Sequence, residues 1–360
     1  MANSKACYIH DITTATPGLA LHRDDALTLL GPAFQNARTA RLARRLIRLT
    51  EIEKRYLAVL EHQVGTVGRS PLYLPAEEQP NGPTMGARNR LFAEESAKLV
   101  RQVLDGLSHA SLKKIDVLVT CSCTHASSPG LEHTILTGSP VPATCSRWNL
   151  GFMGCSAALA GLRLAHGLAA SNPRALIVAC ELSSLHFQYS DQLDQLTANL
   201  LFSDGAAAVH VSPEPSAVRI VDCRCVTAPQ HADQMVWFAD DFGLRLHLSQ
   251  ELPATLAALL PQAVREMLSD HELESRHVDH WLVHPGGPQI LDSVENCLGL
   301  GAGRLDLSRS VLRRYGNMSS PTICFILKEH IERRLDGWCV ALAFGPGLTI
   351  ELALLDIRRQ

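Results

Sequence analysis

Short apolar runs alternate along this chain with longer segments of helical pattern, and this alternation limits the fold most strongly. The strand-like runs are 115–122, 175–182, 206–212, 217–226, 280–285, 338–344 and 348–355. The helical segments are 91–107, 156–170, 253–269, 288–298 and 319–335. Strands that are apolar at nearly every position are typical of sheets buried on both faces. The alternation therefore predicts an α/β fold whose helices cover a mixed or mostly parallel sheet.

The length suits one or two packed domains. The chain has 360 residues, of which 46% are hydrophobic, and this is an ordinary composition for a globular protein that holds a large core. A polar, proline-punctuated stretch at Ser212–Val218 interrupts the pattern and is typical of a connection. We expect an N-terminal half at 1–213 and a C-terminal half at 214–360.

Charge and cysteine content exclude several classes of protein. A formal net charge of −3 carries no nucleic-acid signature. The 11 cysteines show neither a compact disulfide framework nor the paired spacing of zinc ligands, so we expect free thiols and no metal site. We see no leader peptide, and no apolar run reaches the ~18 residues that span a membrane. The expected location is the cytoplasm, without stable membrane insertion.

One cysteine has unusual neighbours. Cys155 follows Gly154 and precedes the small apolar run 156–170, which reads as a buried helix. A cysteine at the start of a helix lies near the positive end of the helix dipole, which lowers the pKa of its thiol. The residue is then a candidate nucleophile. A buried structural thiol is the alternative, and this stretch alone does not separate the two.

Two other polar residues occur at comparable positions. His284 ends an apolar strand and turns through Gly286 and Gly287 into a helix, and Asn317 follows Gly316 before another helix. A core histidine and a helix-capping asparagine are the ordinary alternatives. Functional residues gather at such strand ends in α/β folds, so the three residues together indicate a Cys-His-Asn site.

The chain resembles a known family, the type III polyketide synthases (chalcone synthase-like), and within it the bacterial alkylpyrone or alkylresorcinol branch. The resemblance rests on five ordered motifs: GFMGCSAAL, LLFSDGAAAVHV, VHPGGPQILDSVE, YGNMSSPTICFIL and AFGPGLTIEL. It covers the chain from about Thr50 onward. It implies a five-layer αβαβα thiolase fold of two similar halves, and a homodimer with one site per chain.

The resemblance also implies the chemistry. Cys155 would take an acyl group from an acyl-CoA, as a thiolate nucleophile does. His284 and Asn317 would stabilise the enolate formed when malonyl-CoA loses CO2, and His284 would hold the Cys155 thiolate as an imidazolium. The CoA thioesters are substrates, and no cofactor is required. Repeated condensation and cyclisation would give a pyrone or resorcinol, with a fatty acyl starter favoured by Leu246, Cys123 and the GFMGCSAA wording.

Family alignment also implies which residues line the substrate pocket. Phe202 matches one gating phenylalanine, and Leu246 replaces the other, so the pocket is expected to be reshaped or wider there. Cys123 stands where plant enzymes have threonine, and His186 replaces a small residue. The implied lining residues are Phe202, Leu246, Cys123, His186, Ser319, Phe344, Gly345 and Gly347. Ordinary core packing is the alternative for each.

A basic run at Arg38–Tyr56 is the candidate phosphate site. Arg45 matches a residue that contacts CoA phosphate in the family, and Arg44 and Arg48 lie close in sequence. The planar guanidinium of arginine binds phosphate through two hydrogen bonds. A solvated helix face is the alternative. An acyl carrier protein or a fatty-acid synthase is a second candidate acyl donor at this patch.

Two further functions remain open from the sequence. A ketoacyl carrier-protein synthase III would use the same triad for one condensation without cyclisation. A catalytically silent thiolase-fold subunit would bind a partner and lack activity. The presence of Cys155, His284 and Asn317 disfavours the silent subunit.

Overall fold

The computed structural model describes residues 6–27, 37–60 and 70–358. Residues 1–5, which begin the stretch inspected for a leader peptide, lie outside these ranges. Nine strands form one sheet in the order β11-β12-β13-β8-β1-β7-β6-β4-β5. Their bounds are β1 (Cys7–Ala15), β4 (Val117–Ser122), β5 (Ser146–Gly151), β6 (Ala175–Leu182), β7 (Asp204–Ser212), β8 (Val218–Thr227), β11 (His280–Val283), β12 (Gly337–Gly345) and β13 (Thr349–Ile357).

The sheet divides into two halves that meet at β1. This strand pairs with β7 along most of its length but with β8 only through Cys7, Tyr8 and Ile9. β4, β5 and β6 run parallel in one half, as do β11 and β12 in the other. The predicted boundary at 213/214 falls between β7 and β8, the two strands that flank β1, and remains a prediction.

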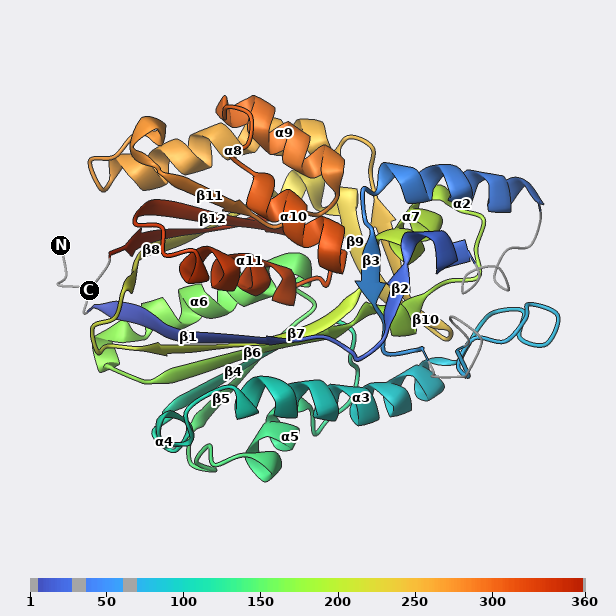
Figure 1. Ribbon diagram of the computed structural model, residues 1–360, viewed down its shortest axis with the longest axis horizontal. Helices are drawn as coiled ribbons and strands as arrows, with labels where there is room; N and C mark the ends of the chain where they lie inside the picture. Colours follow the sequence, from blue (N-terminus) through green and yellow to red (C-terminus); the bar gives the residue numbers. More distant parts are fainter. Residues whose placement is uncertain (1–5, 28–36, 61–69, 359–360) are drawn as a thin grey trace.

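The molecule is layered, as Figure 1 shows. Helices α8 (Leu252–Ser269) and α9 (Pro288–Leu298) cover the C-terminal half-sheet on the outside. Helices α6 (Ala157–Gly167) and α11 (Pro321–Glu332) lie between the two half-sheets. Helices α3 (Met85–Asp105) and α5 (Leu131–Gly138) cover the other outer face. The predicted five-layer αβαβα thiolase fold is confirmed.

Each interface between layers has its own apolar core. The first surrounds α6 and α11 and includes Leu159, Leu162 and Ile326. The second lies between the N-terminal half-sheet and α3, and the third between the C-terminal half-sheet and α8 and α9. Strands β4, β6 and β7 are buried at every position, because helices cover both of their faces.

Shorter elements surround the edge of the sheets where the candidate residues lie. Two small antiparallel sheets form there: β2 (Ala20–His22) pairs with β3 (Lys54–Tyr56), and β9 (Met235–Asp240) forms a hairpin with β10 (Gly243–Leu248). The remaining helices are α2 (Ala37–Leu49), α4 (His109–Leu112), α7 (Leu193–Leu201) and α10 (Asp306–Tyr315). Within the described ranges, no helix combines the length and apolar character needed to cross a membrane.

Candidate active site

Cys155 lies in a sharp turn between β5 and α6. The turn continues as a single 3₁₀ turn, Gly154–Ser156, that leads directly into α6. Both Phe152 and Gly154 have positive φ, 57° and 60°. A Cβ on residue 154 would lie 2.6 Å from Cδ of Pro346, so only glycine fits at this close approach.

The glycine-rich turn at Ala343–Gly347 packs against the loop that carries Cys155. A Cβ on Gly345 would collide with the hydroxyl of Ser156 and the carbonyl of Met153. Gly347 has a φ of 117°. Phe344 packs in the apolar core beneath α8 and α9, and it is not among the residues that line the cavity described below. The structure therefore gives this turn a contact with the Cys155 loop.

Asn317 presents its amide to the cysteine. Sγ of Cys155 lies 3.9 Å from Oδ1 and 4.0 Å from Nδ2 of Asn317. Oδ1 already accepts a 2.8 Å hydrogen bond from the backbone N–H of Ser319, a residue held at a φ of 58°. The Asn317 main chain bonds to Leu201 and Ser203 on both sides. The amide is thus fixed with its N–H group available beside the thiol.

His284 is the third member of the set. It follows β11, its backbone N–H donates to the carbonyl of Leu342 at 2.8 Å, and it is 1% exposed. Neither ring nitrogen has a hydrogen-bond partner among the described residues. Buried polar atoms are seldom left unpaired, so both ring nitrogens of His284 are candidates for hydrogen bonds to a substrate.

Burial changes the ionisation of both groups. It raises the pKa of the Cys155 thiol to about 11, opposed by the Ser319 hydroxyl and the Asn317 amide, and it lowers the pKa of His284 to about 3. The thiol pKa of Cys155 is therefore raised, and not lowered as expected from the helix dipole, because desolvation by burial is the largest contribution. Between these two residues the structure describes no hydrogen bond, so the expected ion pair stays a prediction.

A small cavity lies beside this set. It has a volume of about 10 Å³, room for about one water molecule. Phe202, Leu246 and His186, all expected from the sequence, line it together with Trp237. Phe202 and Leu246 form a buried cluster against which Cys155 packs. Leu246 lies in the cavity wall beside an aromatic ring, and the expectation that the pocket is reshaped or wider there stays a prediction.

That ring belongs to Trp237, which the sequence did not reveal as a site residue. Its Nε1–H donates to the carbonyl of Cys123 at 3.3 Å, and its ring centroid lies 6.0 Å from that of Phe202. Trp237 pairs across the hairpin with Leu246. A hairpin prediction for 235–248 would have shown it, since cross-strand partners share one face.

Cys123 contacts the loop that carries the nucleophile. It is 3% exposed, and its Sγ accepts a 3.0 Å hydrogen bond from the backbone N–H of Gly154. Ser319, also buried, lies on the opposite side of the thiol next to Asn317. Both residues are therefore close to Cys155; neither lines the cavity described above, so their expected role in the pocket stays a prediction.

Glu181 is a second residue that sequence reasoning missed. It is fully buried, and its carboxylate accepts hydrogen bonds from the backbone of Cys123 (2.9 Å) and from the N–H (3.1 Å) and hydroxyl (2.7 Å) of Thr124. Burial raises its pKa to about 7, although these donors favour the charged form. A lone acidic residue inside the apolar run 175–182 was the available signal.

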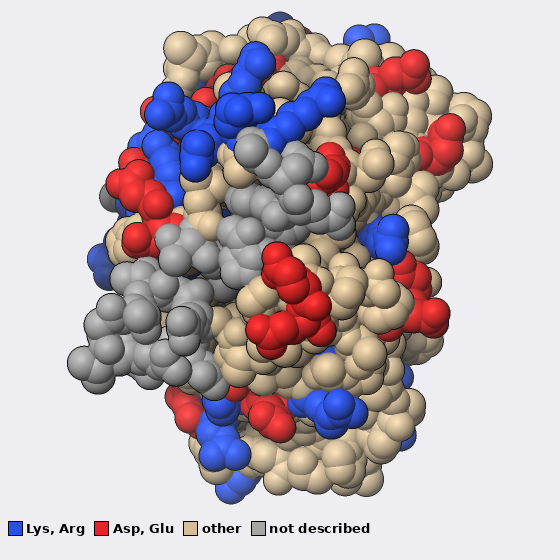
Figure 2. Space-filling view, turned by 90° about the vertical axis from the view of Figure 1, so that its right-hand side faces the viewer, with Lys and Arg blue, Asp and Glu red and all other residues tan. Residues whose placement is uncertain are grey.

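The first part of the basic run forms helix α2, and the arginines of this helix face solvent, whereas Arg55 in β3 is buried. Arg44, Arg45 and Arg48 are exposed, as are Arg38 and Arg41. Figure 2 shows Lys and Arg side chains gathered on the upper part of the face that α2 occupies. No ion pair is described for Arg44, Arg45 or Arg48 within the resolved ranges of the chain, which leaves a surface suited to phosphates. The described residues contain no group of three potential metal ligands.

Comparison with known proteins gives a consistent family. Residues 41–227 match the model of FAE1/type III polyketide synthase-like proteins, and residues 227–357 match the C-terminal domain of chalcone and stilbene synthases. The alpha-pyrone synthesis polyketide synthase-like protein Pks18 of Mycobacterium tuberculosis is 28% identical over 98% of this chain and 91% of its own. A putative chalcone synthase of Bacillus subtilis is 30% identical over 78% of this chain and 84% of its own. The crystal structure of PKS-I from the brown alga Ectocarpus siliculosus superposes with a TM-score of 0.90, at 27% identity, over 99% of this chain and all of that one.

Proposed function

This chain belongs to the type III polyketide synthases, which are acyltransferases that join thioester substrates, and we infer the course of its reaction from that family. The observation that carries the proposal is the amide of Asn317 beside Cys155, which is oriented by the bond from Ser319 to Oδ1 and has Nδ2 directed at Sγ, 4.0 Å away. Such a donor is of use where negative charge develops on a substrate oxygen.

In the first step, Cys155 receives the starter acyl group. Its Sγ attacks the carbonyl carbon of an acyl-CoA, the bond from that carbon to the CoA sulfur breaks, and CoA leaves as a thiol. The proton released from Cys155 passes to the imidazole of His284 and from there to the departing CoA sulfur. The ring nitrogens of His284 have no hydrogen-bond partner among the described residues, so a neutral imidazole has a free nitrogen to accept this proton.

In the second step, malonyl-CoA is decarboxylated. Its carboxylate leaves as CO2, and the electron pair of the broken carbon–carbon bond forms an enolate on the thioester. The N–H groups of Asn317 and His284 donate to the enolate oxygen. The enolate carbon then attacks the acyl carbon on Cys155, and Sγ leaves as the new carbon–carbon bond forms.

We propose that the product is a pyrone and that the starter is a fatty acyl-CoA. The name of the relative Pks18 supports the pyrone. The cavity of about 10 Å³ is much smaller than any acyl chain, so loading requires the Trp237 side chain to move. Ring closure to a resorcinol is the alternative product.

The test is product analysis by mass spectrometry. The purified protein is incubated with malonyl-CoA and a panel of acetyl, long-chain and aromatic acyl-CoA starters, with a long-chain acyl carrier protein thioester as a further arm. Pyrones from long-chain CoA starters support the proposal. A single uncyclised β-ketoacyl product, or no product, contradicts it.

The size of the pocket gives a paired prediction. Trp237→Ala removes the indole ring that closes the cavity, so the ratio of kcat/KM for long-chain to short-chain starters should rise by about tenfold. Leu246→Phe adds volume on the facing strand and should lower the same ratio. Measuring both variants on one starter panel checks this prediction. Equal ratios in both variants would remove the hairpin from the pocket wall.

The arginine surface gives a prediction about substrate binding. Arg45→Ala should raise KM for both CoA thioesters by about five- to tenfold with kcat little changed, because phosphate binding persists through the reaction. The effect should shrink as salt increases. Arg101→Ala, which changes an exposed arginine on α3, is the matched control and should leave KM unaltered. An unchanged KM in Arg45→Ala would place CoA elsewhere.

We also propose that the chain is a homodimer. β5 ends the nine-stranded sheet, and most of its residues are exposed. Trp148 is 48% exposed and the adjacent Phe152 51%. An uncovered edge strand with aromatic side chains is suited to pairing with a second copy. Sedimentation velocity should give twice the mass of the chain, and a monomer at micromolar concentration would contradict the proposal.

A further inference from the structure

The hairpin β9–β10 stands apart from the main sheet. Its two strands pair only with each other, yet it contributes Trp237, Leu244 and Leu246 to the cavity beside Cys155. The position of this pocket wall therefore depends on contacts that link the hairpin to the rest of the chain.

His186 makes one of these links with both of its ring nitrogens. Nδ1 accepts a 3.2 Å hydrogen bond from the backbone N–H of Leu244 in β10. Nε2 lies 3.1 Å from the carbonyl oxygen of Thr124 in the loop after β4. Since the first partner can only donate and the second can only accept, the ring is the neutral Nε2–H tautomer. Burial lowers the pKa of His186 to about 3, so the ring stays neutral at physiological pH.

The loop to which His186 is hydrogen-bonded also contacts the turn that carries Cys155. Cys123 immediately precedes Thr124, and its Sγ accepts the N–H of Gly154, next to Cys155. Its carbonyl accepts the indole N–H of Trp237. The hairpin and the turn that carries Cys155 are thus bonded to the same two-residue segment.

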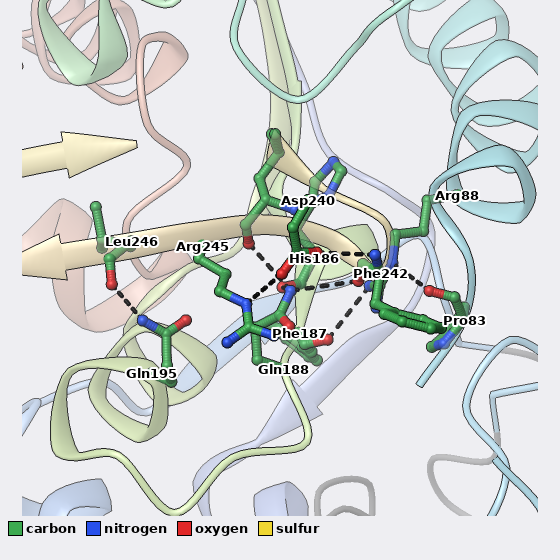
Figure 3. A network of polar contacts seen from close by, with 11 residues as sticks. Pro83, Arg88, His186, Phe187, Gln188, Gln195, Asp240, Phe242, Arg245 and Leu246 are labelled. Carbon is green, nitrogen blue, oxygen red and sulfur yellow. Dashed lines mark hydrogen bonds and ion pairs between the residues drawn. The ribbon is translucent and has the colours of Figure 1, made fainter. Parts of the chain in front are cut away.

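Two glutamines from the same region strengthen the link, as Figure 3 shows. Nε2 of Gln188 donates to the carbonyl of Leu244 at 3.1 Å, and Nε2 of Gln195 donates to the carbonyl of Leu246. The backbone N–H of Leu244 therefore bonds to the side chain of His186, and its carbonyl bonds to the side chain of Gln188. At the tip, the N–H of Met85 donates to the carbonyl of Asp241 at 2.9 Å.

We propose that His186 is a positioning residue that holds the β9–β10 hairpin against the loop after β4 and so limits the size of the acyl group that Cys155 accepts. The proposal deepens the proposed function and depends on it for its substrate. The cavity admits about one water molecule, so an acyl chain enters only when the wall formed by Trp237, Leu244 and Leu246 moves. A shift of the hairpin away from the loop breaks either the bond of His186 to Leu244 or its bond to Thr124, and the strength of this link sets how readily larger chains enter.

Three variants test this proposal. His186→Leu keeps an apolar side chain of moderate size and removes both hydrogen bonds. Oδ1 of His186→Asn stands close to the position of Nδ1 and can still accept the N–H of Leu244, whereas the amide of His186→Gln stands close to the position of Nε2 and can keep only the bond to Thr124. The Gln and Asn variants form a matched pair if the leucine variant does not fold.

Two readouts separate positioning from a general structural role. Hydrogen exchange of the peptide covering 235–248 should quicken about tenfold in the Leu and Gln variants and stay closer to wild type in the Asn variant. The ratio of kcat/KM for long-chain to short-chain starters should rise in the same two variants, by about tenfold. Exchange in α3 and β6 should be unchanged.

The contrary results are equally definite. If His186→Leu and His186→Gln leave hairpin exchange and the starter ratio unchanged, His186 does not position the hairpin. If His186→Asn behaves like His186→Leu, the hydrogen bond to Leu244 does not decide the position of the hairpin, which also overturns the proposal. Hydrogen exchange needs no turnover, so a protein that makes no polyketide would refute the proposed function without deciding the role of His186.

Discussion

Alanine at position 155 is expected to abolish polyketide formation while malonyl-CoA still loses CO2. Without Sγ the starter acyl group has no covalent acceptor, and product formation should fall by roughly 10⁴-fold or more. The donors that stabilise the enolate, Asn317 and His284, remain in place, so decarboxylation continues. Product mass spectrometry and release of labelled CO2 from malonyl-CoA measure the two reactions in one sample.

The control for this variant is a second thiol in the same site. Cys123→Ser keeps an acceptor for the backbone N–H of Gly154 and should retain product formation within about tenfold. Polyketide formed by Cys155→Ala at the wild-type rate would contradict the assignment of the nucleophile. Loss of product in Cys123→Ser alone would move that assignment to Cys123.

The His284→Ala variant is expected to slow both the decarboxylation of malonyl-CoA and the alkylation of Cys155. Decarboxylation should fall by about 10²–10³-fold, because one enolate donor is lost. Alkylation of Cys155 by iodoacetamide at pH 7.5 should also slow, since burial raises the thiol pKa to about 11 and no imidazole is left to accept the proton. The rate should then rise with pH up to that value, because the thiolate is the reactive form.

Asn317→Ala separates the two effects of the histidine. It removes an enolate donor but leaves the imidazole, so decarboxylation should fall while alkylation of Cys155 stays near the wild-type rate. Mass mapping of the alkylated peptide against time provides the measurement. Equal alkylation rates in wild type and His284→Ala would show that the imidazole takes no proton from Cys155.

The layered fold could be predicted because its signals are local. Strand β6 was predicted with its observed bounds, Ala175–Leu182, since every position in it is apolar or buried. Helix α9 was also predicted with its bounds, because Pro288 begins it and Gly299, at a φ of 62°, ends it. The five layers came from the family resemblance, since spacing alone does not specify how two half-sheets stack.

The hairpin β9–β10 could not be predicted in the same way. Its strands mix polar and aromatic residues and pair only with each other, so they lack the continuous apolar pattern of the main sheet. Its position depends on side chains distant in sequence, such as His186 and Gln195. Trp237 was missed for this reason, and the expectation of a reshaped or wider pocket at Leu246 stays a prediction.

The motifs identified Cys155, His284 and Asn317 as candidate site residues, but they did not predict the pKa of the thiol or the orientation of the amide. The sequence indicates a helix start behind Cys155, which favours a thiolate. It does not show that the thiol is enclosed, and burial raises the pKa. The orientation of the Asn317 amide likewise depends on a hydrogen bond from Ser319, a contact that only the folded turn creates.

The most direct test of the central claim is to locate the acyl group on the enzyme. The protein is mixed with a long-chain acyl-CoA in the absence of malonyl-CoA, quenched in acid, digested and analysed by peptide mass spectrometry. We predict one acyl group per chain on the peptide that contains Cys155, discharged when malonyl-CoA is added before the quench. An acyl group on another cysteine, or none on the protein under conditions that yield product, would contradict the account.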